Sequence, residues 1–442
     1  MKKRIELFAK KFLEKSHNKE IYIISHFDTD GITSAAIIIK TLKKLDKKFS
    51  VKIIKNLEEQ IIRDLPKDKL ILFLDLASGS LENIKKSNIK EIFIIDHHEI
   101  SEPEKIPENV TILNPELLNK EKISAAGLCY LFSKEINPSN KENSKFAVLG
   151  MIGDRLEKNL DKLNNEILND SEVIKKRGLL LFPATRPINR VLEFNSNPYI
   201  PGVTGDIKGV LSLLREIKLK PLNGKYKNIL ELDEREMSNL TTAIMLRKPR
   251  AQNIEIIGDI FLIKIFNKLE DARELSAMIN ACSRLGHPEI ALQTCLEIPT
   301  AKKTAESLHV KYKRFLISGL EFVNKTEKTQ GENYVIINAK NKIQDTIIGT
   351  IASILSMSSI YEPGTTIITM ANYHNDKKIK VSARCVGDSG KNLRELLHNV
   401  VSKIGGEVGG HKFAAGCLIE KEKEKDFINS LRKNLEVEIV RV

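Results

Sequence analysis

Acidic and histidine residues gather in four short segments of the first 155 residues, each at the end of a run that predicts a strand. These segments are His26-Phe27-Asp28-Thr29-Asp30-Gly31, Leu74-Asp75, Asp96-His97-His98 and Gly153-Asp154-Arg155. Carboxylates and imidazoles together suit Mn²⁺, Mg²⁺ or Zn²⁺. Two such ions about 3.5–4 Å apart stabilise the attacking and the leaving oxygen of a phosphoryl displacement. Each segment alone is also typical of a turn or a helix cap, and only the joint pattern indicates a metal site for phosphoryl transfer.

The carboxylates of the first two segments have a spacing that suits two metal ions. In an extended turn, Asp28 and Asp30 point the same way and can bind neighbouring ions. Asp75, alone at the end of its strand, is placed to bridge both ions. Gly31 lets a helix begin tightly after the turn, so that the helix N-terminus faces an anion. These residues therefore predict the centre of a two-metal site.

The adjacent histidines His97 and His98 are predicted to have different roles. His97 is predicted to bind metal while His98 reaches the phosphate, and Asp96 is expected to orient both of them. The full set of predicted metal ligands is His26, Asp28, Asp30, Asp75, His97 and Asp154. The predicted catalytic residues are Asp28, Asp30, Asp75, His97, His98 and Asp154.

The elements that must position these residues alternate along the first part of the chain. Short apolar runs at 21–24, 70–74 and 92–95 predict buried strands. Helical periodicity at 32–45 follows the first of these runs. Continuous apolar strands with helical crossovers predict an α/β fold with a doubly wound parallel sheet that is covered on both faces. In such a sheet the ligand site lies at the carboxyl ends of the strands.

The rest of the chain predicts a helical region and a second, smaller α/β unit. The Pro- and Asn-rich segment 183–202 predicts a long loop, and 301–322 predicts a linking helix with a basic face. From residue 334 onward, strands and helices alternate again. We therefore expect a catalytic domain at 1–160, a helical insert with the linking helix at 161–325, and a C-terminal substrate-binding domain at 326–442.

Composition narrows the class of protein. The 442 residues carry a formal net charge of +13, which suits a polyanionic partner, although lysines also simply cover solvated faces. The five cysteines are scattered without a CxxC pair, so we expect neither a disulfide framework nor a thiolate zinc site, and a reducing cytoplasm fits best. No apolar stretch is long enough for a membrane span, and the basic start lacks the pattern of a signal peptide.

The four acidic segments closely resemble the motifs of the DHH phosphoesterase family. Asp96-His97-His98 corresponds to the motif that names the family, and the order of the other segments matches its remaining N-terminal motifs. Two further segments, Ile112-Leu113-Asn114-Pro115 and Ser124-Ala125-Ala126-Gly127, are similar to those that follow the third motif in archaeal RecJ-like members. The resemblance implies two divalent ions, with Mn²⁺ preferred and Mg²⁺ as the other choice.

The C-terminal unit is similar to the DHH-associated C-terminal domain. The segment Gly409-Gly410-His411-Lys412-Phe413-Ala414-Ala415-Gly416 resembles its glycine-rich signature, except that Val408 replaces one glycine. Ser382-Ala383-Arg384 resembles the Ser-x-Arg substrate clamp of the family. The resemblance implies that Ser382, Arg384, Gly409, Gly410 and His411 bind substrate phosphates.

One further segment points to RecJ-like exonucleases within the family. Asn280-Ala281-Cys282-Ser283-Arg284-Leu285 resembles a RecJ segment in which the Arg holds a substrate phosphate, so Asn280 and Arg284 join the predicted substrate-binding residues. The implied activity is hydrolysis of single-stranded DNA or RNA, with replication or repair proteins as further partners and no membrane. The direction of cleavage is left open.

The predicted substrate-binding residues and the family motifs are also compatible with other roles. Arg284 and Arg384 are also compatible with surface ion pairs, and His411 with an ordinary loop histidine. One alternative function is a phosphoesterase for short oligonucleotides or cyclic dinucleotides. Another is a non-catalytic scaffold in a replication complex, since some DHH-derived proteins act in this way. Such scaffolds tend to lose metal ligands, whereas this sequence retains the complete predicted set, which favours an enzyme.

Overall fold

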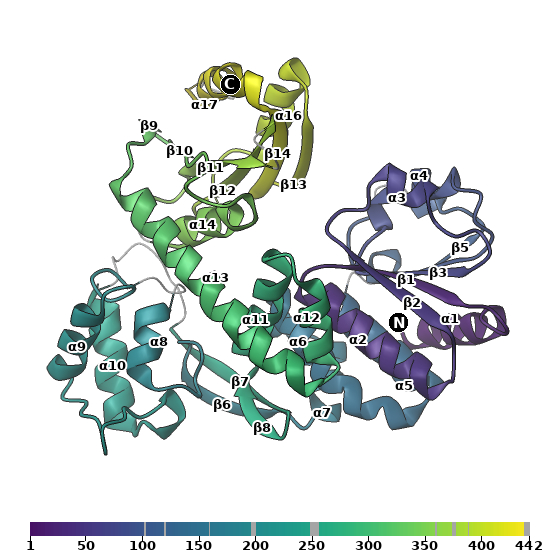
Figure 1. The fold of residues 1–442 in the computed structure, drawn as a ribbon, viewed down its shortest axis with the longest axis horizontal. Coiled ribbons are helices and arrows are strands. Elements are labelled where there is room, and N and C mark those ends of the chain that lie inside the picture. Colours follow the sequence, from purple (N-terminus) through teal and green to yellow (C-terminus); the bar gives the residue numbers. More distant parts are fainter. Residues whose placement is uncertain are drawn as a thin grey trace. The chain divides into compact units, whose positions relative to one another are not determined.

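The computed structural model describes residues 1–100, 103–118, 121–158, 160–195, 200–247, 256–358, 360–373, 377–387 and 389–436 (Figure 1). The chain divides into two units. The first contains Met1–Lys176 and Asp259–His309, and the second contains Arg177–Gly258 and Val310–Val442. The chain therefore leaves the first unit after residue 176 and returns to it at residue 259.

A five-stranded parallel sheet forms the centre of the first unit, as predicted. Its strands are β1 (Ile21–His26), β2 (Phe49–Ile54), β3 (Leu70–Leu74), β4 (Ile92–Ile95) and β5 (Val110–Leu113). They lie in the order β2-β1-β3-β4-β5. The sequence analysis does not identify β2 and β5, because both are edge strands and are only partly buried. In a sheet of this order the ligand site lies beyond the carboxyl ends of β1 and β3, where the strand order reverses.

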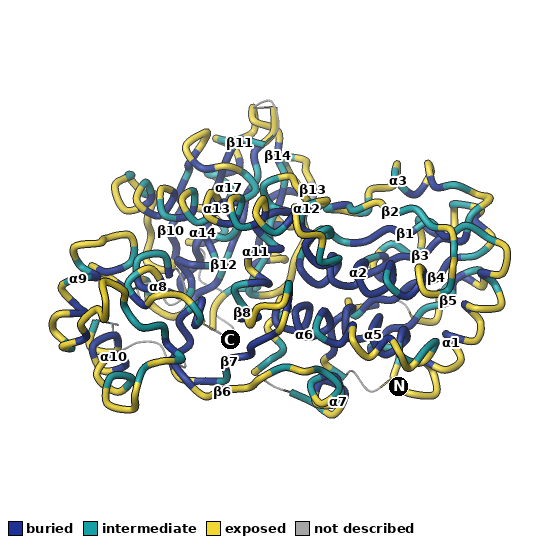
Figure 2. Tube along the Cα trace, turned by 60° about the horizontal axis from the view of Figure 1, so that its bottom comes forward, coloured by how far each residue is buried: buried dark blue, intermediate teal, exposed yellow. Residues whose placement is uncertain are grey.

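Helices cover both faces of this sheet. On one face, the helices that share a single apolar core with Leu72 of β3 include α1 (Lys2–Lys15), α2 (Thr29–Lys44), α5 (Ala125–Ile136), α6 (Ser144–Gly153), α11 (Ala272–Arg284) and α12 (Pro288–Cys295). On the other face, α3 (Glu59–Arg63) and α4 (Leu81–Lys85) pack against Ile71 and Phe73. This alternation along β3 is the period-two pattern of a strand that is buried on both faces. Much of α2 is coloured as buried in Figure 2.

Further elements complete the first unit and lead out of it. They are α7 (Lys162–Asp170), a three-stranded sheet of β6 (Ile174–Leu179), β7 (Ile257–Ile265) and β8 (Lys268–Asp271), and the long helix α13 (Pro299–Lys325). Because α11 and α12 contribute Cys282 and Ala291 to the same core as α2, the returning segment is part of the interior of the first unit.

The second unit contains a mixed six-stranded sheet, which confirms the predicted smaller α/β domain. In spatial order its strands are β13 (Glu407–His411), β14 (Ala414–Glu420), β12 (Lys378–Cys385), β11 (Thr366–Tyr373), β10 (Tyr334–Asn338) and β9 (Thr329–Gly331). Only β10 and β11 pair in parallel among these described strands. The helices α14 (Asp345–Met357), α16 (Leu393–Ile404) and α17 (Glu424–Glu436) accompany this sheet.

The insert between the α/β parts is helical, with α8 (Ile188–Phe194), α9 (Ile207–Glu216) and α10 (Glu234–Arg247). The prediction of a loop over 183–202 is wrong for residues 188–194. Pro187 precedes the first turn of α8, where a missing N–H removes no helical hydrogen bond, and Ile188 and Val191 bury one face of the helix. Residues 196–199 of the predicted loop lie outside the described residues. Within the described part of the chain, no helix has the length and apolar character that crossing a bilayer requires.

Candidate metal centre

The predicted acidic and histidine residues meet at the carboxyl end of the first sheet. His26 is the last residue of β1, Asp75 directly follows β3, and His97 is the second residue after the end of β4. Among the residues that the structure describes, three groups of side chains lie close enough together to hold a cation. They are His26, Asp28 and Asp75, then Asp30, His97 and Asp154, and finally Asp75, His97 and His98. Asp75 and His97 each belong to two groups, so the three groups form one continuous cluster.

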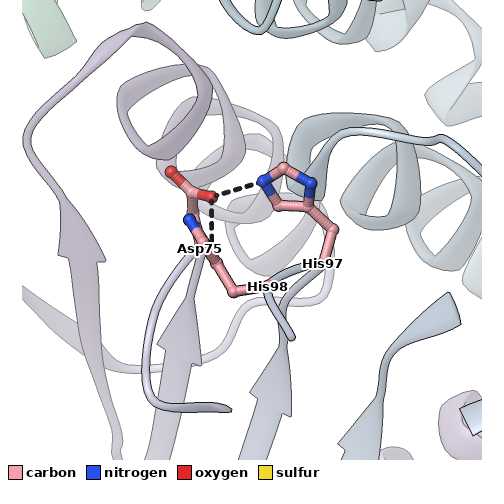
Figure 3. Close-up of side chains that lie close together, drawn as sticks. All are labelled: Asp75, His97 and His98. Carbon is pink, nitrogen blue, oxygen red and sulfur yellow. Dashed lines mark ion pairs between the residues drawn. The ribbon is translucent and has the colours of Figure 1, made fainter. Parts of the chain in front are cut away.

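Asp75 occupies the middle of this cluster. Its two oxygens face different partners, with Oδ2 at 3.3 Å from His26 Nδ1 and Oδ1 at 3.3 Å from His97 Nε2. Figure 3 shows this carboxylate together with His97 and with His98, whose Nδ1 lies 3.9 Å from Oδ1. The backbone at Asp75 has a φ of 60°, and its N–H donates to the carbonyl of Ile95 at 2.9 Å. A non-glycine residue in this region stores strain, and such strain is commonly found at functional sites.

Asp28 and Asp30 are held by the ends of two helices. Asp28 is the N-cap of α2 and accepts a hydrogen bond from the Gly31 N–H at 3.1 Å. Asp30 accepts from the N–H groups of Ala125 and Ala126, at 2.7 and 2.9 Å, at the N-terminus of α5. That terminus carries partial positive charge, which favours a carboxylate. A Cβ at Gly31 would stand 2.3 Å from the His26 carbonyl oxygen, so only glycine allows this tight turn.

Asp154 follows a helix, which corrects the prediction that it ends a strand. The run before it is apolar throughout and forms α6, and periodicity alone does not distinguish such a run from a buried strand. Asp154 Oδ2 lies 3.3 Å from His97 Nε2, and Asp30 Oδ2 lies 3.7 Å from the same nitrogen. A Cβ at Gly150 would stand 2.4 Å from Asp30 Oδ1. The glycine therefore lets α6 approach α2 closely beside the acidic and histidine cluster.

Asp96 is buried behind the two histidines. Its Oδ1 accepts from the His97 N–H at 2.8 Å and lies 2.7 Å from His98 Nδ1, and its Oδ2 accepts from the Ser78 N–H at 3.0 Å. Although burial raises the pKa of Asp96, the contacts with His98 and Ser78 lower it below its ordinary value. Asn114 Nδ2 donates to the His98 carbonyl and to Ser78 Oγ, each at 2.9 Å. This network fixes the histidine loop, and the sequence analysis missed Ser78 as part of it.

The charge of the cluster favours a cation. Burial raises the pKa of Asp75 well above its ordinary value, and the charges of Asp28 and Asp30 raise it further. Burial and the charge of Asp30 raise the pKa of Asp154 in the same way. Burial lowers the pKa of His26, but the adjacent carboxylates of Asp28 and Asp75 raise it to about 10. So many buried acids held together are destabilising unless positive charge compensates them.

Unsatisfied atoms support the same conclusion. Both oxygens of Asp75, Oδ2 of Asp154 and Nδ1 of His26 are buried and make no well-formed hydrogen bond among the described residues. Buried polar atoms are rarely left without a partner, and divalent cations take carboxylate oxygens and imidazole nitrogens as ligands. The donors present therefore fit one or two divalent ions, with Asp75 shared.

The helix that carries Asn280 and Arg284 belongs to the same unit as the metal centre. Thr29 Oγ1, at the start of α2, donates to the Ser276 carbonyl of α11 at 2.9 Å. Asn280 and Arg284 follow one and two turns later, and Arg284 Nε donates to Asn280 Oδ1 at 3.3 Å. Eight residues of helix rise about 12 Å. This hydrogen bond and the shared apolar core thus join the helix that carries the predicted phosphate-binding residues to α2.

The predicted substrate-binding residues of the second unit lie on β12 and β13, the two strands that flank β14. Gly409 of β13 pairs with Gly416 of β14, which pairs with Ser382 of β12. In the next row, His411 pairs with Ala414, which pairs with Arg384. Residues directly opposite each other across an antiparallel ladder face the same side of the sheet. Gly410 has a φ of 118°, and a Cβ there would stand 2.4 Å from the Ala414 carbonyl oxygen.

Family models and related sequences account for most of the chain. The model of the DHH family N-terminal domain matches residues 20–153, the DHH-CID domain matches 182–254, and the DHHA1 domain matches 331–436. The chain is 31% identical over 445 residues to the uncharacterized protein MJ0831 of Methanocaldococcus jannaschii, covering 96% of each. It is 27% identical over 146 residues to a putative single-strand DNA-specific exonuclease, YorK, of Bacillus subtilis, covering 31% of this chain and 25% of that protein.

Solved structures with low sequence identity share the fold. RecJ of Thermus thermophilus in complex with Mn²⁺ matches with a TM-score of 0.60 at 17% identity, over 98% of this chain and 54% of that chain. The chain thus spans about half of that RecJ. CDC45 of Entamoeba histolytica matches with a TM-score of 0.68 at 11% identity, over 98% and 99% of the two chains. With its acidic and histidine cluster, its matching domains and its full-length relative, the chain belongs to the DHH family.

Proposed function

We propose that this protein is a divalent-metal-dependent phosphodiesterase that degrades single-stranded nucleic acid as an exonuclease. The observation that carries the proposal is the cluster around Asp75, in which three groups of metal-binding side chains share two members. The structural similarity to RecJ and the sequence similarity to a putative single-strand DNA-specific exonuclease support the choice of substrate. The basic net charge of +13 is compatible with it.

Two divalent ions, Mn²⁺ or Mg²⁺, fit the ligands of this cluster. One would be held by His26, Asp28 and Asp75, and the other by Asp30, His97 and Asp154 together with Asp75. When bound, such ions activate water for attack on phosphorus and stabilise charge on the leaving oxygen. Asp30 makes two hydrogen bonds to α5 and Asp28 makes one to α2, so the protein holds both carboxylates in place.

The remaining residues of the first unit would orient the substrate. The His98 side chain is 50% exposed, and its Nδ1 lies 2.7 Å from Asp96, so its Nε2 is left to contact a phosphate oxygen. A buried carboxylate that fixes one ring nitrogen also fixes the orientation of the other. Arg284 and Asn280, further along α11, would hold a phosphate beyond the scissile one.

The second unit would bind the strand through its backbone phosphates. Ser382 and Arg384 on β12 lie in register with Gly409 and His411 on β13, and Gly410 completes this set. Glycines there allow phosphate to approach the peptide backbone, and guanidinium groups bind phosphate with paired hydrogen bonds. We extend the proposal to domains at 1–160, 161–325 and 326–442, to replication or repair proteins as partners, and to a cytoplasmic location, since all five cysteines are free.

A scaffolding role is the second candidate, because the fold matches CDC45 over nearly the full length of both chains. The complete ligand set favours catalysis. A phosphoesterase for short oligonucleotides or cyclic dinucleotides is the alternative among enzymes.

The deciding experiment follows single-stranded DNA and RNA, labelled at the 5′ or the 3′ end, during incubation with Mn²⁺. We expect stepwise shortening from one end, and the labelled end that disappears first gives the direction of cleavage. Asp154→Asn serves as the inactive control because it removes a predicted ligand. Absence of cleavage in the parent protein would favour the scaffold, and faster cleavage of dinucleotides than of long strands would favour the short-substrate enzyme.

A further inference from the structure

Arg384 is held by a helix that the residues discussed so far do not include. Its Nε donates to Ser353 Oγ of α14 at 2.9 Å, and its Nη1 donates to the Ala383 carbonyl at 2.8 Å. Ser353 Oγ donates in turn to the Gly349 carbonyl at 3.0 Å. A hydroxyl has one hydrogen and two lone pairs, so it can make both contacts at once. The guanidinium is thus fixed from the helix on one side and from its own strand on the other.

Gly349 stands in the interior of α14 beside the same residues. Glycine is among the least favourable residues in a helix interior, which indicates a local reason for its presence. A Cβ at this position would stand 3.2 Å from Ser382 Oγ and 3.9 Å from Arg384 Nη2. Ser382 is only 5% exposed, so the space over it is narrow. The missing side chain leaves that space open.

We propose that α14 completes the phosphate-binding subsite of the second unit. Ser353 is a positioning residue that fixes the plane of the Arg384 guanidinium, and Gly349 keeps the approach to Ser382 and Arg384 open for a phosphodiester. Paired hydrogen bonds from guanidinium to phosphate require this plane to be set before binding. The inference rests on the proposed function, because it takes a nucleic-acid strand as the ligand.

The test measures binding of a fluorescently labelled oligothymidylate to the full-length protein by anisotropy, in EDTA so that no cleavage occurs. Ser353→Ala should weaken binding about two- to tenfold, since it removes one hydrogen bond. Ser353→Thr keeps the hydroxyl and should bind like the parent. Gly349→Ala should weaken binding at least as much, while its thermal transition should not fall, because alanine favours the helix. Ser402→Ala, an exposed serine of α16, is the matched control.

A double-mutant cycle shows whether Ser353 acts through Arg384. In the Arg384→Ala background, Ser353→Ala should have no further effect, because its partner is gone. In cleavage assays with metal, Ser353→Ala should raise KM and leave kcat nearly unchanged.

Three results would overturn the inference, and they differ in what they imply for the proposed function. If Arg384→Ala weakens binding but neither Ser353→Ala nor Gly349→Ala does, the proposed role of α14 is refuted, and the phosphate subsite at Arg384 remains supported. If the Arg384→Ala variant itself binds the strand like the parent, both the role of α14 and the phosphate subsite at Arg384 are wrong. An equal loss from Ser353→Ala with and without Arg384 would also show that the serine does not act through the arginine.

Discussion

Asp75→Asn tests the metal centre without disturbing the backbone. The change removes one negative charge and keeps the shape of the side chain, and asparagine tolerates the φ of 60° at this position. Asp75 is 2% exposed and neither oxygen makes a well-formed hydrogen bond to a described residue, while burial and the charges of Asp28 and Asp30 raise its pKa. Because an acid with a raised folded-state pKa is destabilising when ionised, the metal-free parent loses stability at neutral pH through this group.

The substitution should therefore stabilise the metal-free protein. Relief of a buried charge that the neighbouring carboxylates of Asp28 and Asp30 oppose is worth about 1–3 kcal/mol, which corresponds to a rise in Tm of about 2–12 °C for a unit of this size. Saturating Mn²⁺, at about 100 times its Kd, should add about 2.7 kcal/mol to the free energy of unfolding of the parent. In Asp75→Asn that increment should largely disappear, together with cleavage, because the shared ligand has lost its charge.

Thermal unfolding in EDTA and in a series of Mn²⁺ concentrations measures both effects. Asp46→Asn is the matched control, since Asp46 also has a positive φ, of 51°, but is exposed. It should respond to Mn²⁺ as the parent does. A lower Tm for metal-free Asp75→Asn, or a response to Mn²⁺ equal to that of the parent, would refute the reasoning.

Three further predictions concern other parts of the molecule. Arg284→Ala should raise KM about ten- to a hundredfold on a long strand, with less effect on kcat and on dinucleotides, whereas Arg63→Ala, at an exposed ion pair, should change neither. Single strands should be cleaved faster than blunt duplexes, and strand binding should weaken steeply as salt rises; equal rates on both substrates would contradict this. Burial raises the pKa of Asp170, but hydrogen bonds from Lys134 and Tyr130 lower it below the ordinary value. The stability gained from a lowered pKa is fully present above the unfolded pKa and is lost as pH falls through the folded pKa. Asp170→Asn should therefore cost about 1–2 kcal/mol at pH 7 and progressively less in acid below the unfolded pKa; a cost independent of pH would count against the pairing.

The strands of the first sheet could be predicted because they are continuous and apolar. The runs at β1, β3 and β4 are buried on both faces, and the acidic segments follow them directly. The same criterion failed at α6, where packing on several sides makes a helix as uniformly apolar as a buried strand. It also failed at α8, because composition alone does not show that Ile188 and Val191 face a core.

The side chains of the acidic and histidine cluster could be named from the sequence, but the groups that support them could not. Asp30 depends on the N–H groups of Ala125 and Ala126, and main-chain donors carry no signal in side-chain type. The N-cap serine at the start of α5, Ser124, is the one sequence feature that indicates a helix terminus there. The hydrogen bond from Thr29 to Ser276 joins residues that are 247 positions apart, a contact that no local pattern predicts.

The returning segment also determines when the first unit can fold during synthesis. The core around α2 and α6 includes Ile279 and Cys295, so a nascent chain that ends near residue 176 leaves that apolar surface uncovered. The ribosome must add the whole insert before α11 and α12 emerge, which takes on the order of 10 s at typical elongation rates. During that interval the carboxylates that follow β1 and β3 are already made, but α11, which bonds to Thr29 beside them, is not. We therefore expect the newly made N-terminal segment to be a client of chaperones, and a gene fragment that stops near residue 176 to yield aggregated protein.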